Sequence, residues 1–328
     1  MECFKFIIPL NGTYTTRILY FSGNIILALI SFIGNGVVMY LVWYNTKLHR
    51  PTYYFMSALA LSDFTTAFFG QLTFCIEVTF KQFTSCAYDK VIAFFNASSC
   101  SSSLFLLCLI ARDRYIHVAK RTLYQSHMSI TYSKRASAAS FLVGIFIATL
   151  FVIEDRFVRV VSTLAFAVVA SSCFTFIAVH SKRILRIVGD HIRHMHESMP
   201  QEATVRQAGN VQASEAMERA INRSIFSVIA LYLFAWTPVI ILMLIFAYHN
   251  IKGKHIADEY RYAFAWCSFV SYFNGALNPV VYSFRCDAIG QEMRKLVRRF
   301  FCLKSFMAVE NSETIPSSGK RRPSVIRQ

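Results

Sequence analysis

Seven long apolar runs limit this chain to folds that exist within a lipid bilayer. A helix of about 20 apolar residues spans roughly 30 Å of hydrocarbon. Lipid offers no partner for backbone N–H and C=O groups, so each run is expected to form a helix. The predicted fold class is an all-α membrane protein, a seven-transmembrane helix bundle. The runs extend over Ile18 to Trp43, Tyr53 to Glu77, Asp89 to Val118, Ala136 to Ile153, Val158 to Val179, Ile221 to Tyr248 and Tyr262 to Phe284.

The basic residues are distributed unevenly about these runs. With the N-terminus outside, nine of the 34 Lys and Arg residues are extracellular and 25 are cytoplasmic. Membrane proteins concentrate Lys and Arg on the cytoplasmic side, so we expect a multi-pass plasma-membrane protein with an extracellular N-terminus. The formal net charge of +16 then reflects topology and attraction to anionic lipids. No nucleic-acid partner is expected. The nine are Lys5, Arg17, Lys81, Lys90, Arg156, Arg159, Lys252, Lys254 and Arg261.

The chain divides into four predicted parts. They are an extracellular N-terminus (1–17), the transmembrane domain (18–284), an amphipathic membrane-surface helix (285–302) and a disordered cytoplasmic tail (303–328). Within 285–302, apolar residues recur at spacings of three and four with Arg and Lys between them, which is typical of a helix on a membrane surface. The longest connection, 182–222, is polar and charged, and we expect a cytoplasmic loop there.

Two modification sites follow from this topology. Asn11-Gly12-Thr13 is a glycosylation sequon on the predicted outer side. Cys302 follows the amphipathic helix beside basic residues, which makes it a candidate for palmitoylation, the alternative being an unmodified thiol. Four cysteines lie near the predicted oxidising exterior, and their pairing is not fixed by the sequence: Cys3, Cys75, Cys86 and Cys267.

Polar residues lie within several of the apolar runs. A charged side chain at the centre of a bilayer costs on the order of 2.5–3.5 kcal/mol, so Asp63 requires an explanation. We interpret it as part of one buried polar network with the other polar residues at membrane depth: Asn35, Ser99, Ser103, Asn274 and Asn278.

Five motifs occur in order on the predicted helices. They are Gly34-Asn35, the LALSD stretch ending at Asp63, Asp113-Arg114-Tyr115, Trp236-Thr237-Pro238, and Asn278-Pro279-Val280-Val281-Tyr282. Together they make residues 18–302 resemble the rhodopsin-like (class A) G-protein-coupled receptors. The resemblance implies a receptor that binds an extracellular ligand and activates a heterotrimeric G protein by movement of the sixth helix. It also implies receptor kinases and arrestin as partners.

The resemblance assigns roles to individual residues. The activation switch would consist of Asp113, Arg114, Tyr115, Glu218, Trp236, Pro238, Asn278, Pro279 and Tyr282. Glu218 would pair with Arg114 across helices in the resting state, and Pro238 would let the sixth helix bend. A sodium ion is the expected co-ligand, held by Asp63, Ser103, Asn274 and Asn278, and no other cofactor is expected. A water-filled polar core without an ion is the alternative.

The ligand is less well defined than the receptor class. Asp89 occupies the position of the usual disulfide cysteine, Val168 that of the helix 5 proline, and Gly144 lies near that of the helix 4 tryptophan. These departures resemble the melanocortin, cannabinoid, lysophospholipid and adenosine receptor group. Asn96 stands where amine receptors carry an aspartate. A small molecule, a lipid and a peptide all remain possible ligands, and the expected pocket residues are Glu77, Asp89, Asn96, Trp236, Met243 and Tyr272.

Two other functions compete with signalling. A transporter would explain intramembrane Asp63 and the Asn residues, but the chain shows no related halves with paired broken helices. A heptahelical scaffold that does not signal is the second alternative. An enzyme is not expected, since the sequence carries no Ser-His-Asp or metalloprotease motif.

Overall fold

The computed structural model describes residues 13–79, 86–120, 124–153, 155–197, 232–253, 258–285, 288–296 and 298–299. Its helices are α1 (Tyr14–Tyr44), α2 (Pro51–Thr65), α3 (Leu72–Thr79), α4 (Cys86–Ala119), α5 (Tyr124–His127), α6 (Ile130–Val152), α7 (Arg156–Glu197), an unlabelled helix over Tyr232–Lys252 and α9 (Asp258–Arg285). A 3-10 helix, η1 (Thr46–Leu48), and a π-helical segment, η2 (Thr66–Gln71), complete these elements.

Side chains that satisfy free backbone N–H groups mark where several helices begin. The Thr13 hydroxyl accepts from Thr16 N at 3.3 Å at the start of α1, and Ser129 Oγ accepts from Tyr132 N at 3.0 Å at the start of α6. Such caps stabilise a helix by about 1 kcal/mol each. The Tyr232–Lys252 helix ends at Gly253, whose positive φ of 65° suits a residue without a Cβ.

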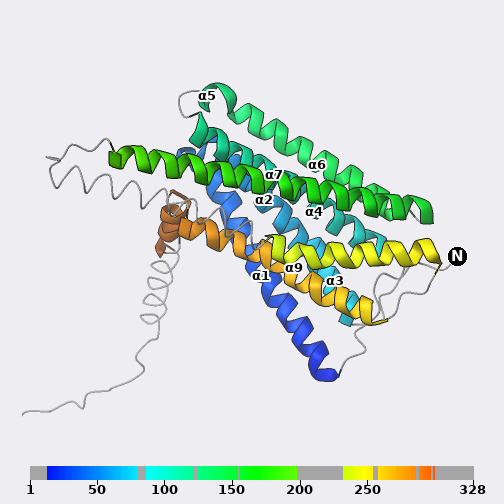
Figure 1. Ribbon diagram of the computed structural model, residues 1–328. Coiled ribbons are helices and arrows are strands. Elements are labelled where there is room, and N and C mark those ends of the chain that lie inside the picture. Colours follow the sequence, from blue (N-terminus) through cyan, green and yellow to red (C-terminus); the bar gives the residue numbers. More distant parts are fainter. Residues whose placement is uncertain are drawn as a thin grey trace, which may run out of the picture.

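The helices form the expected bundle (Figure 1). Six of those described are long and apolar enough to cross a membrane: Tyr14–Tyr44, Pro51–Ile76, Lys90–Ala119, Ile130–Val152, Arg156–Asp190 and Tyr232–Lys252. The seventh, α9, carries Asn274 and Asn278 on its buried side and packs against α1 and α2. Helix α4 is central, since it contacts α2, η2, α6 and α7. The predicted seven-helix bundle is confirmed.

One predicted boundary is wrong. We expected the fifth helix to end near Val179 and a loop to begin at 182, but α7 continues to Glu197 (Figure 1). Apolarity ends where the bilayer ends, whereas a helix continues as long as its backbone hydrogen bonds do. Residues 182–197 contain no proline to stop it. The rest of the predicted loop lies outside the described residues, as do Asn11, Glu218 and Cys302.

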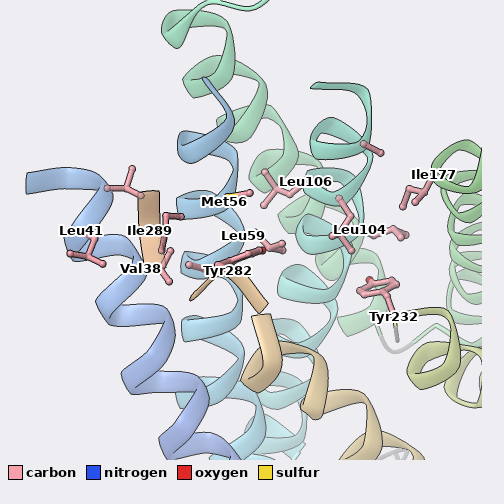
Figure 2. Packing of buried hydrophobic residues seen from close by; sticks show 14 of the residues in the cluster. Val38, Leu41, Met56, Leu59, Leu104, Leu106, Ile177, Tyr232, Tyr282 and Ile289 are labelled. Atoms are coloured by element: carbon pink, nitrogen blue, oxygen red, sulfur yellow. The ribbon is translucent and has the colours of Figure 1, made fainter. Parts of the chain in front are cut away.

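The helix over 288–296 is anchored to the bundle by its apolar side. Ile289 is 0% exposed and belongs to the same buried cluster as Val38 and Leu41 of α1, with Tyr282 beside it (Figure 2). The Ser283 hydroxyl donates to Met293 Sδ at 2.8 Å. Arg294 and Lys295 are exposed, as expected of an amphipathic helix whose polar side faces away from the core.

Small residues bring α4 and α6 unusually close together. A Cβ built on Gly144 would lie 2.2 Å from Ser102 Oγ and 2.6 Å from the backbone oxygen of Ser98. Ser137, Ser140 and Ala148 continue this buried side of α6. Small side chains let membrane helices approach until their backbones are nearly in contact. Gly144, which lies near the position of the usual helix 4 tryptophan, thus leaves room for close packing along the α4–α6 seam, the contact between these two helices.

Candidate functional site

A cavity lies in the middle of the bundle. It is bounded by α1, α2, η2, α4, α9 and the Tyr232–Lys252 helix. Its walls include three residues predicted for the ligand pocket and all four predicted for sodium. The lining residues are Ser31, Leu59, Asp63, Thr66, Ala67, Gln71, Asn96, Cys100, Ser103, Leu107, Tyr232, Trp236, Ser271, Tyr272, Asn274, Gly275 and Asn278.

Asp63 is the centre of the polar part of this cavity. Its Oδ2 atom accepts from Asn278 Nδ2 at 2.7 Å, which joins α2 to α9. Ser103 Oγ donates to Ser62 Oγ at 2.9 Å, and Ser62 in turn donates to the backbone oxygen of Ser99. A buried carboxylate needs such partners because desolvation without them is costly. The polar network therefore connects α2, α4 and α9.

Asn35 ties α1 to α9 next to this network. Its Nδ2 donates to the backbone oxygen of Gly275 at 3.0 Å and to Ser31 Oγ at 3.1 Å. One residue earlier, a Cβ on Gly34 would lie 2.9 Å from the ring of Pro279. The Gly34-Asn35 motif is therefore explained by contact with α9: the glycine allows close approach and the asparagine holds the backbone.

The residues around Asp63 have the chemistry of a small-cation site. One carboxylate, the hydroxyl of Ser103 and the amides of Asn274 and Asn278 line the same cavity. Asn274 Nδ2 is buried without a hydrogen-bond partner among the described residues. Hard cations such as sodium prefer oxygen ligands of these types. The donor set fits sodium, which would supply positive charge beside Asp63, and the ion remains a proposal.

Asp63→Asn is expected to abolish stabilisation of the protein by sodium, because the one carboxylate among the described lining residues loses its charge. At a sodium concentration ten times its dissociation constant, binding adds about 1.4 kcal/mol to stability. The measurement is the melting temperature of purified protein in NaCl and in choline chloride at equal ionic strength. Ser98 is not among the lining residues, so Ser98→Ala should retain the difference in melting temperature between the two salts. A sodium effect in Asp63→Asn equal to that in the wild type would exclude the site.

A second hydrogen-bonded pair that lines the cavity carries no carboxylate. The Tyr272 hydroxyl donates to Asn96 Oδ1 at 3.1 Å and so connects α9 to α4. A Cβ on Gly70 of η2 would lie 2.6 Å from the same Asn96 oxygen. The π-helical turn of η2 and its glycine thus leave room for the Asn96 side chain. Trp236 lines the same cavity as this pair and the Asp63 network.

Of the three other residues predicted for the ligand pocket, Met243 is the one whose side chain the structure describes. Met243 lines a second cavity instead, between α6, α7 and the Tyr232–Lys252 helix. The side chains of Glu77 and Asp89 lie outside what the structure describes. The structure therefore brings Asn96, Trp236 and Tyr272 together in the central cavity and places Met243 in the second, and the ligand-binding roles of these residues stay predictions.

Gln71 is a cavity residue that the sequence analysis missed. It is 1% exposed, and its Nε2 donates to the backbone oxygen of Asn24 at 3.1 Å and to Asn24 Oδ1 at 3.2 Å. A glutamine and an asparagine within two apolar runs are a detectable signal, since buried amides require partners. The pair fixes α1 against the π-helical turn that positions Asn96.

At the other end of α4, Asp113 is held by two hydroxyl groups. Thr52 Oγ1 donates to its Oδ2 atom at 2.6 Å, and the Tyr124 hydroxyl donates to its Oδ1 atom at 2.7 Å. Asp113 is 0% exposed. Within the described ranges it forms no ion pair with Arg114, so these hydrogen bonds rather than its sequence neighbour satisfy the carboxylate. Thr52 and Tyr124 were not predicted.

The other predicted switch residues occupy several elements. Tyr115 packs edge-on against the ring of His180 at 5.2 Å, with Arg183 5.9 Å from its ring, so α4 meets α7 there. Tyr282 is 6% exposed and lies in the main core (Figure 2). Pro238 stands within the Tyr232–Lys252 helix, which continues past it. The expected Arg114–Glu218 pair stays a prediction.

The hydrogen bond from Tyr124 to Asp113 is expected to persist between pH 6 and 9. Burial, assisted by the carboxylate of Asp113, raises the pKa of Tyr124 to about 12. Folding thus favours the neutral phenol of Tyr124. This contribution to the stability of the fold is complete below the tyrosine pKa of the unfolded chain, about 10, and is lost only as the pH rises through the higher pKa of the folded protein. The melting-temperature difference between wild type and Tyr124→Phe should stay constant over this range, and a steady decline from pH 6 to 9 would contradict it.

Comparison with known proteins identifies the family. Residues 34–282 match the model of the 7 transmembrane receptor (rhodopsin family). Human trace amine-associated receptor 9 is 25% identical over 297 residues, covering 82% of each chain. Mouse trace amine-associated receptor 7e is 25% identical over 78% of this chain and 76% of its own. Human olfactory receptor 5AC2 is 32% identical over 131 residues, 39% of this chain and 42% of its own.

The bundle, its buried polar network and its motif residues define a heptahelical membrane receptor. The chain belongs to the rhodopsin family of seven-transmembrane receptors, as the sequence resemblance implied. It is accordingly a multi-pass membrane protein and a receptor rather than an enzyme. None of these three relatives belongs to the melanocortin, cannabinoid, lysophospholipid or adenosine group, so that narrower resemblance stays a prediction.

Proposed function

We propose that this receptor binds an extracellular ligand in the central cavity and activates a heterotrimeric G protein through movement of the Tyr232–Lys252 helix. One observation carries the proposal: a single cavity is lined by the hydrogen-bonded pair Asn96 and Tyr272, by Trp236, and by the hydrogen-bonded pair Asp63 and Asn278. A ligand there contacts both the moving helix and the polar network.

The mechanism is a shift between two populated states. A ligand that fits the cavity better when Trp236 is displaced stabilises the state in which the inner end of its helix has moved outward. The residues at the inner end of α4 then contact the G protein, with Arg114 as the central group. In the resting state Glu218 would hold Arg114; an exposed pair contributes only about 0–1 kcal/mol, which suits a contact that must open.

The chemistry of the cavity supports a ligand with a neutral hydrogen-bonding group. Asn96 and Tyr272 offer an amide and a phenol, and neither carries charge at neutral pH. The trace amine-associated receptors are named for amines, and an ammonium group prefers a carboxylate. Asn96 stands where amine receptors carry an aspartate, and the Asp63 carboxylate of the same cavity already accepts from Asn278 at 2.7 Å. We infer that recognition at Asn96 and Tyr272 does not depend on an ammonium ion pair.

The proposed orientation places the N-terminus outside the plasma membrane. Asn11 would then be glycosylated, and Cys302 palmitoylated at the inner face. Receptor kinases and arrestin would act on the cytoplasmic side. An N-terminal epitope tag should bind antibody on intact cells and a C-terminal tag only after permeabilisation; the reverse pattern would exclude this orientation.

A ligand panel read by nucleotide exchange on purified G proteins tests the function. Wild-type receptor should accelerate exchange with at least one ligand, and Arg114→Ala should not, at equal surface expression. Exchange that is identical in both proteins would overturn the proposed coupling. A heptahelical scaffold predicts no exchange with any ligand or G protein, and membership of a receptor family speaks against a transporter.

A further inference from the structure

Two cysteine side chains meet where α4 packs against α7. The Cys108 thiol of α4 donates to the backbone oxygen of Cys173 of α7 at 3.8 Å, and it also forms a side-chain hydrogen bond with the Cys173 thiol. Both residues are partly buried and pack against the main hydrophobic core. They lie 65 positions apart in the sequence, so it is the packing of the two helices that brings the thiols together.

Two other thiols of the membrane-spanning helices differ from this pair. Cys100 of α4 and Cys267 of α9 are free and partly buried, and within the described ranges neither is hydrogen-bonded to another thiol. The described residues also contain no group of three or more His, Cys, Asp or Glu side chains that could hold a metal ion. The chemistry that the Cys108–Cys173 pair suits is therefore oxidation of two thiols to a disulfide.

The hydrogen bond between the thiols prepares one of them for reaction. A cysteine attacks through its negatively charged sulfur, and a hydrogen bond donated to a charged group favours that charged form. Donation from Cys108 therefore favours negative charge on the Cys173 sulfur, and Cys108 lies in place as the second, resolving thiol. Both residues lie within spans, Lys90–Ala119 and Arg156–Asp190, so an oxidant that reaches them from the bilayer has to dissolve in lipid.

We propose that Cys108 and Cys173 form a redox site, at which an organic hydroperoxide dissolved in the bilayer creates a disulfide between α4 and α7. The Cys173 sulfur attacks the terminal peroxide oxygen, the O–O bond breaks, and the thiol proton passes to the alkoxide, which leaves as an alcohol. The sulfenic acid formed on Cys173 is then attacked by the Cys108 sulfur, and its hydroxyl group leaves with the Cys108 proton as water. Two thiols are oxidised and one hydroperoxide is reduced.

The disulfide forms beside the helix that is proposed to move. Phe174, the residue after Cys173, packs edge-on against Tyr232 with ring centroids 5.7 Å apart, and the Tyr232 ring lies 6.0 Å from that of Trp236. A covalent bond between α4 and α7 fixes Phe174 against these rings and so biases the position of the Tyr232–Lys252 helix. The inference goes beyond the proposed function, because it concerns a modification of the protein and not its ligand.

The test is peptide mass spectrometry of the purified, reduced full-length receptor in nanodiscs after treatment with cumene hydroperoxide. Thiols that remain free are alkylated after denaturation. The wild type should yield the linked Cys108–Cys173 peptide, and alkylation of both residues should fall together at least fivefold and recover after reduction with dithiothreitol. Alkylation of Cys267, the matched thiol, should stay within twofold. Absence of the linked peptide, or an equal loss at Cys267, would overturn the proposal.

Melting temperatures of two serine variants separate a specific disulfide from general oxidation. Hydroperoxide should raise the melting temperature of the wild type and of Cys267→Ser, because a disulfide restricts the unfolded chain, and should not raise that of Cys173→Ser. An equal rise in Cys173→Ser would contradict the site. If Cys173→Ser does not fold, the wild-type peptide measurement decides alone. Neither readout uses a ligand or a G protein, so its failure leaves the nucleotide-exchange result untouched, and the reverse holds as well.

Discussion

Gly144→Ala is expected to destabilise the folded receptor by about 1–3 kcal/mol, the usual cost of overpacking a tight core. The added Cβ would lie 2.2 Å from Ser102 Oγ and 2.6 Å from the backbone oxygen of Ser98. A serine hydroxyl can rotate away, but a helix backbone cannot, so α4 and α6 must separate. A lower melting temperature and reduced surface expression should result.

Gly189→Ala is the matched control for this substitution. Gly189 lies in α7, and a Cβ there meets nothing within 4 Å. Alanine is favoured over glycine in helices by about 0.8–1 kcal/mol, so this variant should be neutral or slightly more stable. Similar destabilisation by both substitutions would show that the α4–α6 seam is not closely packed.

Asn96→Asp is expected to turn the central cavity into an amine site. The new carboxylate would accept from Tyr272, whose hydroxyl now lies 3.1 Å from Asn96 Oδ1, and would attract an ammonium group. A hydrogen bond to a charged group contributes about 1.5–3 kcal/mol, which corresponds to roughly a 10- to 150-fold gain in affinity. The neutral alcohol analogue should gain nothing.

Binding of 2-phenylethylamine and 2-phenylethanol to wild type and Asn96→Asp measures this change. The amine should gain affinity only in the variant, and Asn96→Ala serves as the control for lost volume. If the amine binds wild type and Asn96→Asp equally, Asn96 does not contact the ligand and the neutral-pocket interpretation fails.

The helix bundle could be predicted from the sequence because a lipid environment allows few backbone structures. In lipid every backbone polar group must be satisfied within a helix, so seven apolar runs define seven helices. The same reasoning misplaced the end of α7, since helical hydrogen bonding continues to Glu197 after the apolar run has ended. Hydropathy locates the membrane rather than the end of the helix.

The site was predictable where motifs fix both a residue and its depth in the membrane. Asp63 and Asn278 are 215 positions apart in the sequence and form a hydrogen bond, as expected of two members of one polar network. Thr52 and Tyr124 were missed because threonine and tyrosine are common near helix ends. Their distances from Asp113 along the sequence match no motif that would indicate a contact with it. Met243 lines the second cavity because the direction of its side chain depends on how the Tyr232–Lys252 helix packs against α6 and α7, which the sequence does not give.

The link between the central cavity and the inner end of the bundle is tested most directly by measuring how a bound G protein changes the affinity for an agonist. With an agonist from the panel, the dissociation constant should be measured in nanodiscs with and without nucleotide-free G protein. Because coupling between two sites is reciprocal, the G protein should tighten agonist binding by about 5- to 150-fold in wild type and have little effect in Arg114→Ala. Equal affinity in wild type with and without the G protein would contradict a link between the central cavity and the inner end of the bundle.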